Sequence, residues 1–264
     1  MLGRHLRAAP TLLRVGFAGV VAYRAEMVVW VLTASLPLVM LALWNAAAAQ
    51  GPLAGFGQAE FARYFTATLV VRQLTGAWVV WELNHLVRTG ALSPQLLRPV
   101  NPLGQNLAET VAALPFRLIV LAPILGALLA WRPDIAWSPS PVQALLGVLS
   151  VMLAFLLSWL VQAMFGMLAF WLEQSLGLFS LWYAAYAVLG GYFLPLALLP
   201  APVRTLADWL PFQATLATPV EVALGLSADP VRAVLVQAGW VVLAILLAAV
   251  MWRRGLRRYG AVGA

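Results

Sequence analysis

The sequence has no cysteine and no lysine, and only two histidines among its 264 residues. Without cysteine, neither a disulfide framework nor a thiolate metal site can form. Without lysine, the phosphate-binding loop G-x-x-x-x-G-K-[ST] is excluded. We therefore expect the chain to hold no cofactor of its own, and any ATP and Mg²⁺ to be bound by another polypeptide.

Metal ligands are also scarce. Glu82 and His85 form one E-x-x-H pair on a helix face, but a dimetal carboxylate site requires that motif twice. The other histidine, His5, lies far away near the N-terminus. We expect no metal site, and we interpret His85 as an ordinary residue of the membrane interface.

Charged residues make up only 9% of the chain, whereas 63% of it is hydrophobic, a composition far from that of a soluble domain. The charges cluster and leave six stretches that can each hold a spanning helix of about 20 residues. We predict an all-α integral membrane protein with six transmembrane helices, over residues 27–47, 61–83, 111–131, 142–172, 175–199 and 233–252. The second stretch contains Arg72 and the third contains Arg117.

Arginine carries all of the positive charge, and the net charge is +7. In a membrane protein such an excess indicates orientation and anionic lipid rather than nucleic acid. Ten arginines fall on one predicted side, namely Arg4, Arg7, Arg14, Arg24, Arg88, Arg98, Arg253, Arg254, Arg257 and Arg258, against Arg63, Arg132, Arg204 and Arg232 on the other. This distribution predicts that both termini are cytoplasmic.

Residues 1–24 form a predicted segment of their own, followed by a membrane domain over residues 25–264. Apolar residues recur in this segment at near-helical spacing with arginines between them, which favours a cytoplasmic helix lying in the interface. A cleaved signal peptide is the alternative. It is disfavoured because Arg24 and Glu26 interrupt the apolar stretch.

Arg72 and Arg117 each cost about 2.5–3.5 kcal/mol at a helix centre, so neither should face lipid. Two explanations stay open. Together with Gln73, they line a translocation pathway that meets an anionic or zwitterionic headgroup. Alternatively, they pair with helix-end carbonyls or with an acid on a partner subunit.

The loop over residues 85–102 has the features of a short amphipathic helix. Gly90 marks a break, Ser93 can cap a helix that has Pro94 at its first position, and Pro99 can end it. Leu96 and Leu97 give this helix an apolar side. Such a helix either docks on a partner protein or lies on the lipid headgroups.

Prolines at five positions forbid one continuous helix between residues 195 and 219: Pro195, Pro200, Pro202, Pro211 and Pro219. The apolar residues between them, including Phe193 and Trp209, predict short re-entrant helices in the outer leaflet. An ordinary interfacial loop is the alternative.

The run V-R-T-G-A-L-S-P-Q-L-L-R-P-V over residues 87–100 resembles the cytoplasmic loop of type-2 ATP-binding-cassette exporter permeases, in which G-[TA]-L…L-L…P-[VL] follows the second span. The segment from G-G-Y-F-L-P, which starts at Gly190, through T-P-V-E, which ends at Glu221, is similar to that family's external segment. The motif W-V-V-W-E over residues 78–82 resembles a branch that works beside a second, different permease and a separate ATPase.

The resemblance implies a non-catalytic permease subunit of a bacterial inner-membrane exporter for an amphiphilic or hydrophobic substrate. Its implied partners are a dimeric ATPase and a second permease, either a different chain or a second copy. It assigns coupling to the ATPase to Arg88, Gly90, Leu92, Ser93, Leu96, Leu97, Arg98 and Pro99, and an external cap of the exit to Gly191, Phe193, Pro195, Pro200, Trp209, Pro211, Phe212 and Pro219. Ser93 departs from the family, which often has an acid there.

Three other classes of function compete with this one. An ion-coupled transporter or channel is disfavoured because every acid lies near a predicted helix end or in a loop, although sodium could use backbone carbonyls. A membrane-embedded enzyme is the weakest option because histidine is scarce and cysteine is missing. An assembly scaffold is the third.

Overall fold

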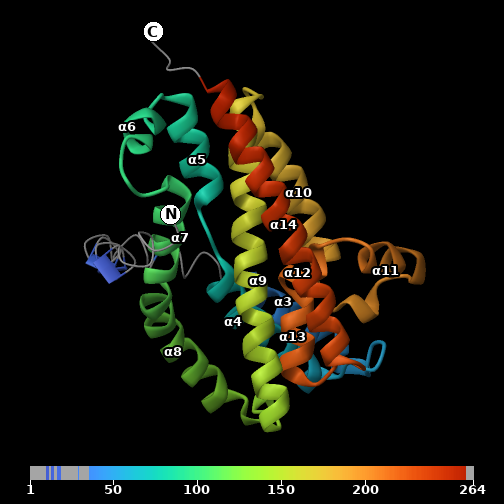
Figure 1. Ribbon diagram of the computed structural model, residues 1–264. Coiled ribbons are helices and arrows are strands. Elements are labelled where there is room, and N and C mark those ends of the chain that lie inside the picture. The colour runs from blue at the N-terminus through green and yellow to red at the C-terminus, as the bar shows by residue number, and fades with distance from the viewer. Residues whose placement is uncertain (1–9, 12, 15–16, 19–28, 30–35, 260–264) are drawn as a thin grey trace.

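The computed structural model describes residues 10–11, 13–14, 17–18, 29 and 36–259 (Figure 1). These residues are mostly helical, and they form no strand beyond one isolated bridge between Leu53 and Phe56. Most of the predicted interfacial helix at residues 1–24 lies outside the described part. Of the first predicted stretch, the structure describes α3 (Leu36–Ala47), which continues into η1 (Ala48–Gln50).

Three helices are long and apolar enough to cross a membrane, at Pro102–Trp131, Pro141–Phe170 and Pro230–Arg258. The elements that form them are α7 (Pro102–Ala112) with α8 (Leu114–Trp131), α9 (Pro141–Met167) with η3 (Leu168–Phe170), and α14 (Pro230–Arg258). Each begins with a proline at its first turn. The residue before that proline is Asn101, Ser140 or Asp229, and its side chain caps the helix by accepting a hydrogen bond from a backbone N–H. The three helices contain the third and sixth predicted stretches, and the fourth except for its last two residues.

The prediction of one continuous helix over residues 61–83 is wrong. The structure has α4 (Gln58–Thr75) and α5 (Val79–Arg88), with an extended residue, Gly76 (φ −64°, ψ 134°), after α4. Helix ends leave carbonyl groups without intrahelical partners. Here the side chain of Arg117 supplies donors to that end, so the chain can break within the bundle.

The fifth predicted stretch, 175–199, is also too long. The structure ends α10 (Ser175–Leu189) ten residues earlier. Gly190 donates its N–H to the carbonyl of Tyr186 at 2.8 Å, and Gly191 follows with φ +83°, a conformation that favours glycine. The hydroxyl of Tyr64 donates to the Gly191 carbonyl at 2.9 Å, which fixes this turn against α4.

Short helices follow α10, as the prolines predicted: η4 (Leu196–Leu198), α11 (Ala201–Asp208), α12 (Phe212–Thr215) and α13 (Ala217–Leu224). Trp209 exposes 79% of its surface, which suits the predicted interfacial position. Phe212 does not, because it is buried with its ring centroid 5.4 Å from that of Trp182. In Figure 1, α11 projects from the side of the bundle and α13 lies beside α9.

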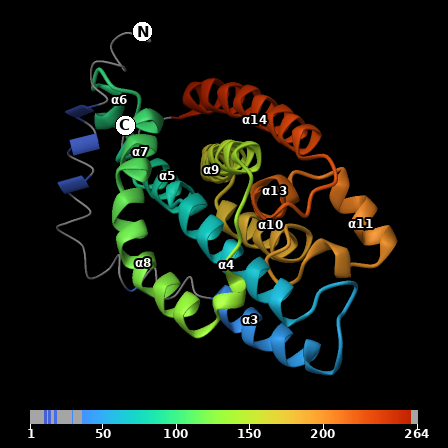
Figure 2. The same cartoon turned by 90° about the horizontal axis from the view of Figure 1, so that it is seen from below.

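α9 lies in the middle of the molecule, with α4, α5, α10, α13 and α14 around it, whereas α8 lies apart from α9 on the far side of α4 (Figure 2). Two glycines let neighbours approach α9 closely. A Cβ atom on Gly166 would lie 3.0 Å from Cβ of Leu83 in α5, and one on Gly147 would lie 3.3 Å from Cα of Ala223 in α13. α9 is therefore in close contact with α5 near its C-terminal end and with α13 near its N-terminal end.

Candidate functional site

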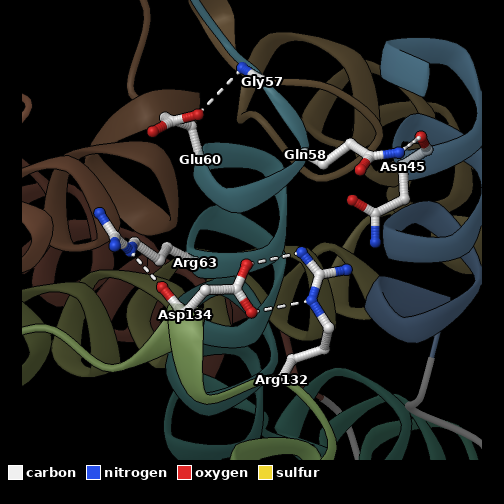
Figure 3. Close-up of polar contacts among 7 residues, drawn as sticks. All are labelled: Asn45, Gly57, Gln58, Glu60, Arg63, Arg132 and Asp134. Atoms are coloured by element: carbon white, nitrogen blue, oxygen red, sulfur yellow. Dashed lines mark hydrogen bonds and ion pairs between the residues drawn. The ribbon is translucent and has the colours of Figure 1, made fainter.

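Apart from Arg72 and Arg117, two groups of arginines lie at opposite ends of the molecule. At one end, η2 (Pro133–Ile135) carries Asp134, whose carboxylate accepts two bonds from Arg132 at 2.8 and 2.7 Å (Figure 3). Arg63 in α4 donates to the Asp134 carbonyl at 2.9 Å. The Arg132 guanidinium lowers the pKa of Asp134. Arg88, Arg98 and the arginines that end α14 lie at the opposite end, which we call the α6 end after α6 (Leu92–Leu96) (Figure 1).

The predicted short helix in the loop after the second stretch exists as α6. The prediction that Ser93 caps it is wrong, because the helix begins at Leu92 with Ala91 as its N-cap and it ends at Leu96. The cause is Gly90, whose φ of +77° reverses the chain after α5 so that its carbonyl accepts a bond from the Ser93 N–H. This turn brings Leu92 inward until none of its surface is exposed.

Two contacts hold this loop against the bundle. The hydroxyl of Ser93 lies 3.2 Å from that of Tyr259, at the end of α14. Arg88, at the end of α5, donates to the carbonyl of Glu173, between η3 and α10. The loop is therefore attached to the end of α14 and to the turn that precedes α10, and it is placed more firmly than a simple connector would be.

The tip of the loop is apolar and exposed. Leu97 exposes 88% of its surface and Leu96 exposes 37%. Arg98 and Pro99 follow and are also exposed. Leu92 therefore anchors the helix, while Leu96 and Leu97 face outward, where they can contact another molecule.

Tyr259→Phe tests the attachment of this loop to α14. The ring should keep its packing against Phe170, at 5.8 Å between centroids, while the bond to Ser93 is lost. Because one partly buried hydrogen bond contributes about 1 kcal/mol, we expect a small loss in the free energy of unfolding. The unfolding midpoint in sodium dodecyl sulfate measures this loss, and a midpoint equal to that of the wild type would contradict the bond between Ser93 and Tyr259.

The two arginines of the predicted pathway meet at the break between α4 and α5. Arg117 is buried, and its Nη1 donates to the carbonyls of Gly76 at 2.6 Å and Gln73 at 3.2 Å. The expected pairing with helix-end carbonyls is thus confirmed for Arg117. Gln73 contributes this carbonyl, while its side chain is buried.

Arg72 has different partners. Its Nη2 donates to the hydroxyl of Tyr183 at 3.2 Å, and its guanidinium lies 5.8 and 5.9 Å from the ring centroids of Tyr183 and Tyr192. Its Nε is buried, with no hydrogen-bond partner within the described residues. No sequence pattern pointed to these tyrosines, which lie more than a hundred positions away.

Within the described part of the chain, Glu82 and His85 belong to no group of three potential metal ligands. Glu82 instead accepts a bond from Asn106 in α7, and Asn106 accepts one from the indole of Trp159 in α9 at 2.9 Å. This network joins α5, α7 and α9. No local sequence pattern indicates that Asn106 and Trp159 belong to such a network.

A cavity of about 850 Å³ lies between α7, the start of α8 and the first half of α9, with α4 and α13 contributing to its lining. Nearly all of its surface is apolar. Leu74, Leu107, Leu114, Val148 and Met152 are among its lining residues. It can take up a hydrocarbon group.

A family model described as ABC-2 family transporter protein matches residues 29–263, nearly the whole chain. Neither a curated protein nor a solved structure matches it.

Proposed function

Because this chain belongs to the ABC-2 family of transporter proteins, a family of membrane transport components, we propose that it is the permease subunit of an ATP-driven exporter in a bacterial inner membrane. The family implies association with an ABC ATPase subunit. In our proposal the chain crosses the membrane six times, with both termini in the cytoplasm. It pairs with a second permease, which is either a different chain or another copy.

The observation that carries this proposal is the exposed Leu97 on a loop that is otherwise well anchored. An exposed leucine at the end of a short helix is what a docking contact requires, since burial of a leucine side chain gives about 2 kcal/mol. The chain lacks the lysine of a phosphate-binding loop, so the energy must come from a partner. We assign that contact to the ATPase.

The division of the arginines supports the proposed orientation. Arg88 ends α5, Arg98 follows α6, and four arginines lie near the end of α14. These three helix ends lie together at the α6 end (Figure 1), whereas Arg63 and Arg132 lie at the η2 end (Figure 3). The more basic end of a membrane protein usually faces the cytoplasm. The α6 end would then face the ATPase, and α11–α13 would cap the outer side as short re-entrant helices.

In this mechanism, ATP binding closes the ATPase dimer and displaces α6. Arg88 and Tyr259 pass the displacement to α10 and α14 through their contacts with Glu173 and Ser93. ATP changes the accessibility of the pathway only if the ATPase binds the two conformations of the permease with different affinity. The substrate is amphiphilic or hydrophobic, which the apolar cavity between α7 and α9 supports.

The natural lack of cysteine gives a direct experiment. A Leu97→Cys chain in whole cells should be shielded from an impermeant maleimide and should crosslink to an ABC ATPase. A matched Ser138→Cys chain, with its exposed cysteine at the η2 end, should be labelled from outside and should not crosslink. Outside labelling of Leu97→Cys, or equal crosslinking of both chains, would overturn the proposal.

A further inference from the structure

Two guanidinium groups converge on one point at the break between α4 and α5. A Cβ atom added to Gly76 would lie 3.2 Å from Nη1 of Arg117 and 3.8 Å from Nη1 of Arg72. Arg72 lies 14 residues after the start of α4, about 21 Å along its axis, so the pair is well inside the bundle. We call these two arginines, with Tyr183 and Tyr192, the two-arginine site.

The positive charge of this site is not balanced by the described residues. Their one ion pair is Arg132–Asp134, at the η2 end. The C-terminal end of α4 provides about half a negative charge, but α5 begins at Val79, only three residues beyond Gly76, and its N-terminal end provides about half a positive charge. The helix ends therefore nearly cancel, and two guanidinium charges remain.

The two arginines differ in how far their donors are used. Arg117 is directed onto the carbonyls of Gln73 and Gly76, and it holds the break together. Arg72 uses Nη2 on the neutral hydroxyl of Tyr183, and its buried Nε has no partner among the described residues. The edge of the Arg72 guanidinium formed by Nε and Nη2 is therefore only partly used in hydrogen bonds.

The same edge of another arginine in this chain shows what it can bind. Nε and Nη2 of Arg132 hold the two carboxylate oxygens of Asp134 at 2.8 and 2.7 Å. An anion with two oxygens on one centre matches this fork.

We propose that the two-arginine site binds the anionic headgroup of the exported amphiphile, with Arg72 as the residue that recognises it. This inference rests on the proposed function and narrows the substrate class to amphiphiles that carry a phosphate or a similar oxyanion. Two exposed indole rings follow the break, Trp78 and Trp81, with centroids 4.6 Å apart. These two indole rings provide apolar surface for the hydrocarbon part of the amphiphile.

Binding of decyl phosphate to the purified full-length chain in dodecyl maltoside, measured by titration calorimetry, tests this inference. Loss of a charged, two-pronged contact should weaken binding by about tenfold in Arg72→Gln. Arg63→Gln removes one positive charge at the η2 end and should bind within about twofold of the wild type. Arg72→Lys, which keeps the charge but not the fork, should fold and bind with an intermediate affinity.

Two further ligands separate the possible sources of the anion. Octyl glucoside, which has no charge, should not compete with decyl phosphate, and inorganic phosphate should compete only at far higher concentration. Equal binding by Arg72→Gln and Arg63→Gln, or competition by octyl glucoside, would overturn the site. Competition by inorganic phosphate at matching concentration would overturn the amphiphile as its ligand. No ATPase is present in this measurement, so its failure is distinguishable from failure of the crosslinking experiment.

Discussion

A Gly255→Ala chain should unfold more easily than the wild type, whereas Gly239→Ala, on the same helix, should be as stable or slightly more stable. A Cβ atom on Gly255 would lie 2.7 Å from Cε2 and 2.9 Å from Cγ of Phe170, whereas one on Gly239 would meet nothing within 4 Å. Overpacking of this kind costs about 1–3 kcal/mol. In an open helical position, alanine gains about 0.5–1 kcal/mol over glycine.

The measurement is unfolding of both variants by sodium dodecyl sulfate in mixed micelles. The ring of Phe170 cannot move aside easily, because Trp171, Trp252 and Tyr259 surround it with centroids 5.8–6.0 Å away. The end of α14 should therefore shift instead, and with it the contact between Tyr259 and Ser93. Identical unfolding curves for the two variants would contradict the close approach of α14 to η3.

Arg117→Met should be the most destabilising single replacement of a charged residue in the described part of the chain. Methionine fills part of the volume but leaves the carbonyls of Gln73 and Gly76 without this donor. A buried carbonyl without a partner costs about 1–3 kcal/mol, so the expected loss is about 2–4 kcal/mol. Arg117→Gln should lose less, because one amide can still donate to one carbonyl.

The control for this prediction is Arg63→Met. Arg63 also donates to a carbonyl, that of Asp134, but this bond is exposed and water can replace it (Figure 3). We expect a change below about 1 kcal/mol. Equal unfolding midpoints for Arg117→Met and Arg63→Met would show that the break does not need its arginine.

The long helices could be predicted because charge-free stretches of about 20 residues report directly on membrane crossing. The break at Gly76 could not be predicted in this way. Counting apolar residues gives no information on backbone carbonyls, and the donor that compensates for the break comes from Arg117, 41 positions away. The signal that was available is Gly76 itself, next to Thr75 in a polar part of the stretch.

The early end of α10 is a similar case. Gly190 and Gly191 were visible, but the stretch over residues 175–199 was predicted from its lack of charged residues. What ends it is the bond from Tyr64 in α4 to the Gly191 carbonyl, across 127 positions. A local pattern reports a possible turn, whereas a distant contact decides whether the turn forms.

In the candidate docking loop, the sequence predicted the short helix and its apolar residues, but it gave Ser93 the wrong role. A serine before a proline favours a cap. In the structure the left-handed conformation of Gly90 lets the helix begin at Leu92, one residue before the serine. The hydroxyl of Ser93 instead forms a hydrogen bond with that of Tyr259, 166 positions away. The pairing of Arg117 with helix-end carbonyls was one of the two explanations that the sequence left open, and the structure selects it.

The close approach at Gly166 limits how this subunit can change shape. The carbonyls of Val79 and Val80 would lie 3.3 and 3.2 Å from a Cβ atom at that position, so no side chain separates the backbones of α5 and α9 there. At the other end of α9, Gly147 lets Ala223 of α13 approach equally closely. Interlocked helices of this kind resist sliding. Displacement of Leu97 by a partner would therefore rotate α5, α9 and α13 together as one rigid body. The distances between these helices would be preserved, and only the angle between this subunit and a neighbouring subunit would change.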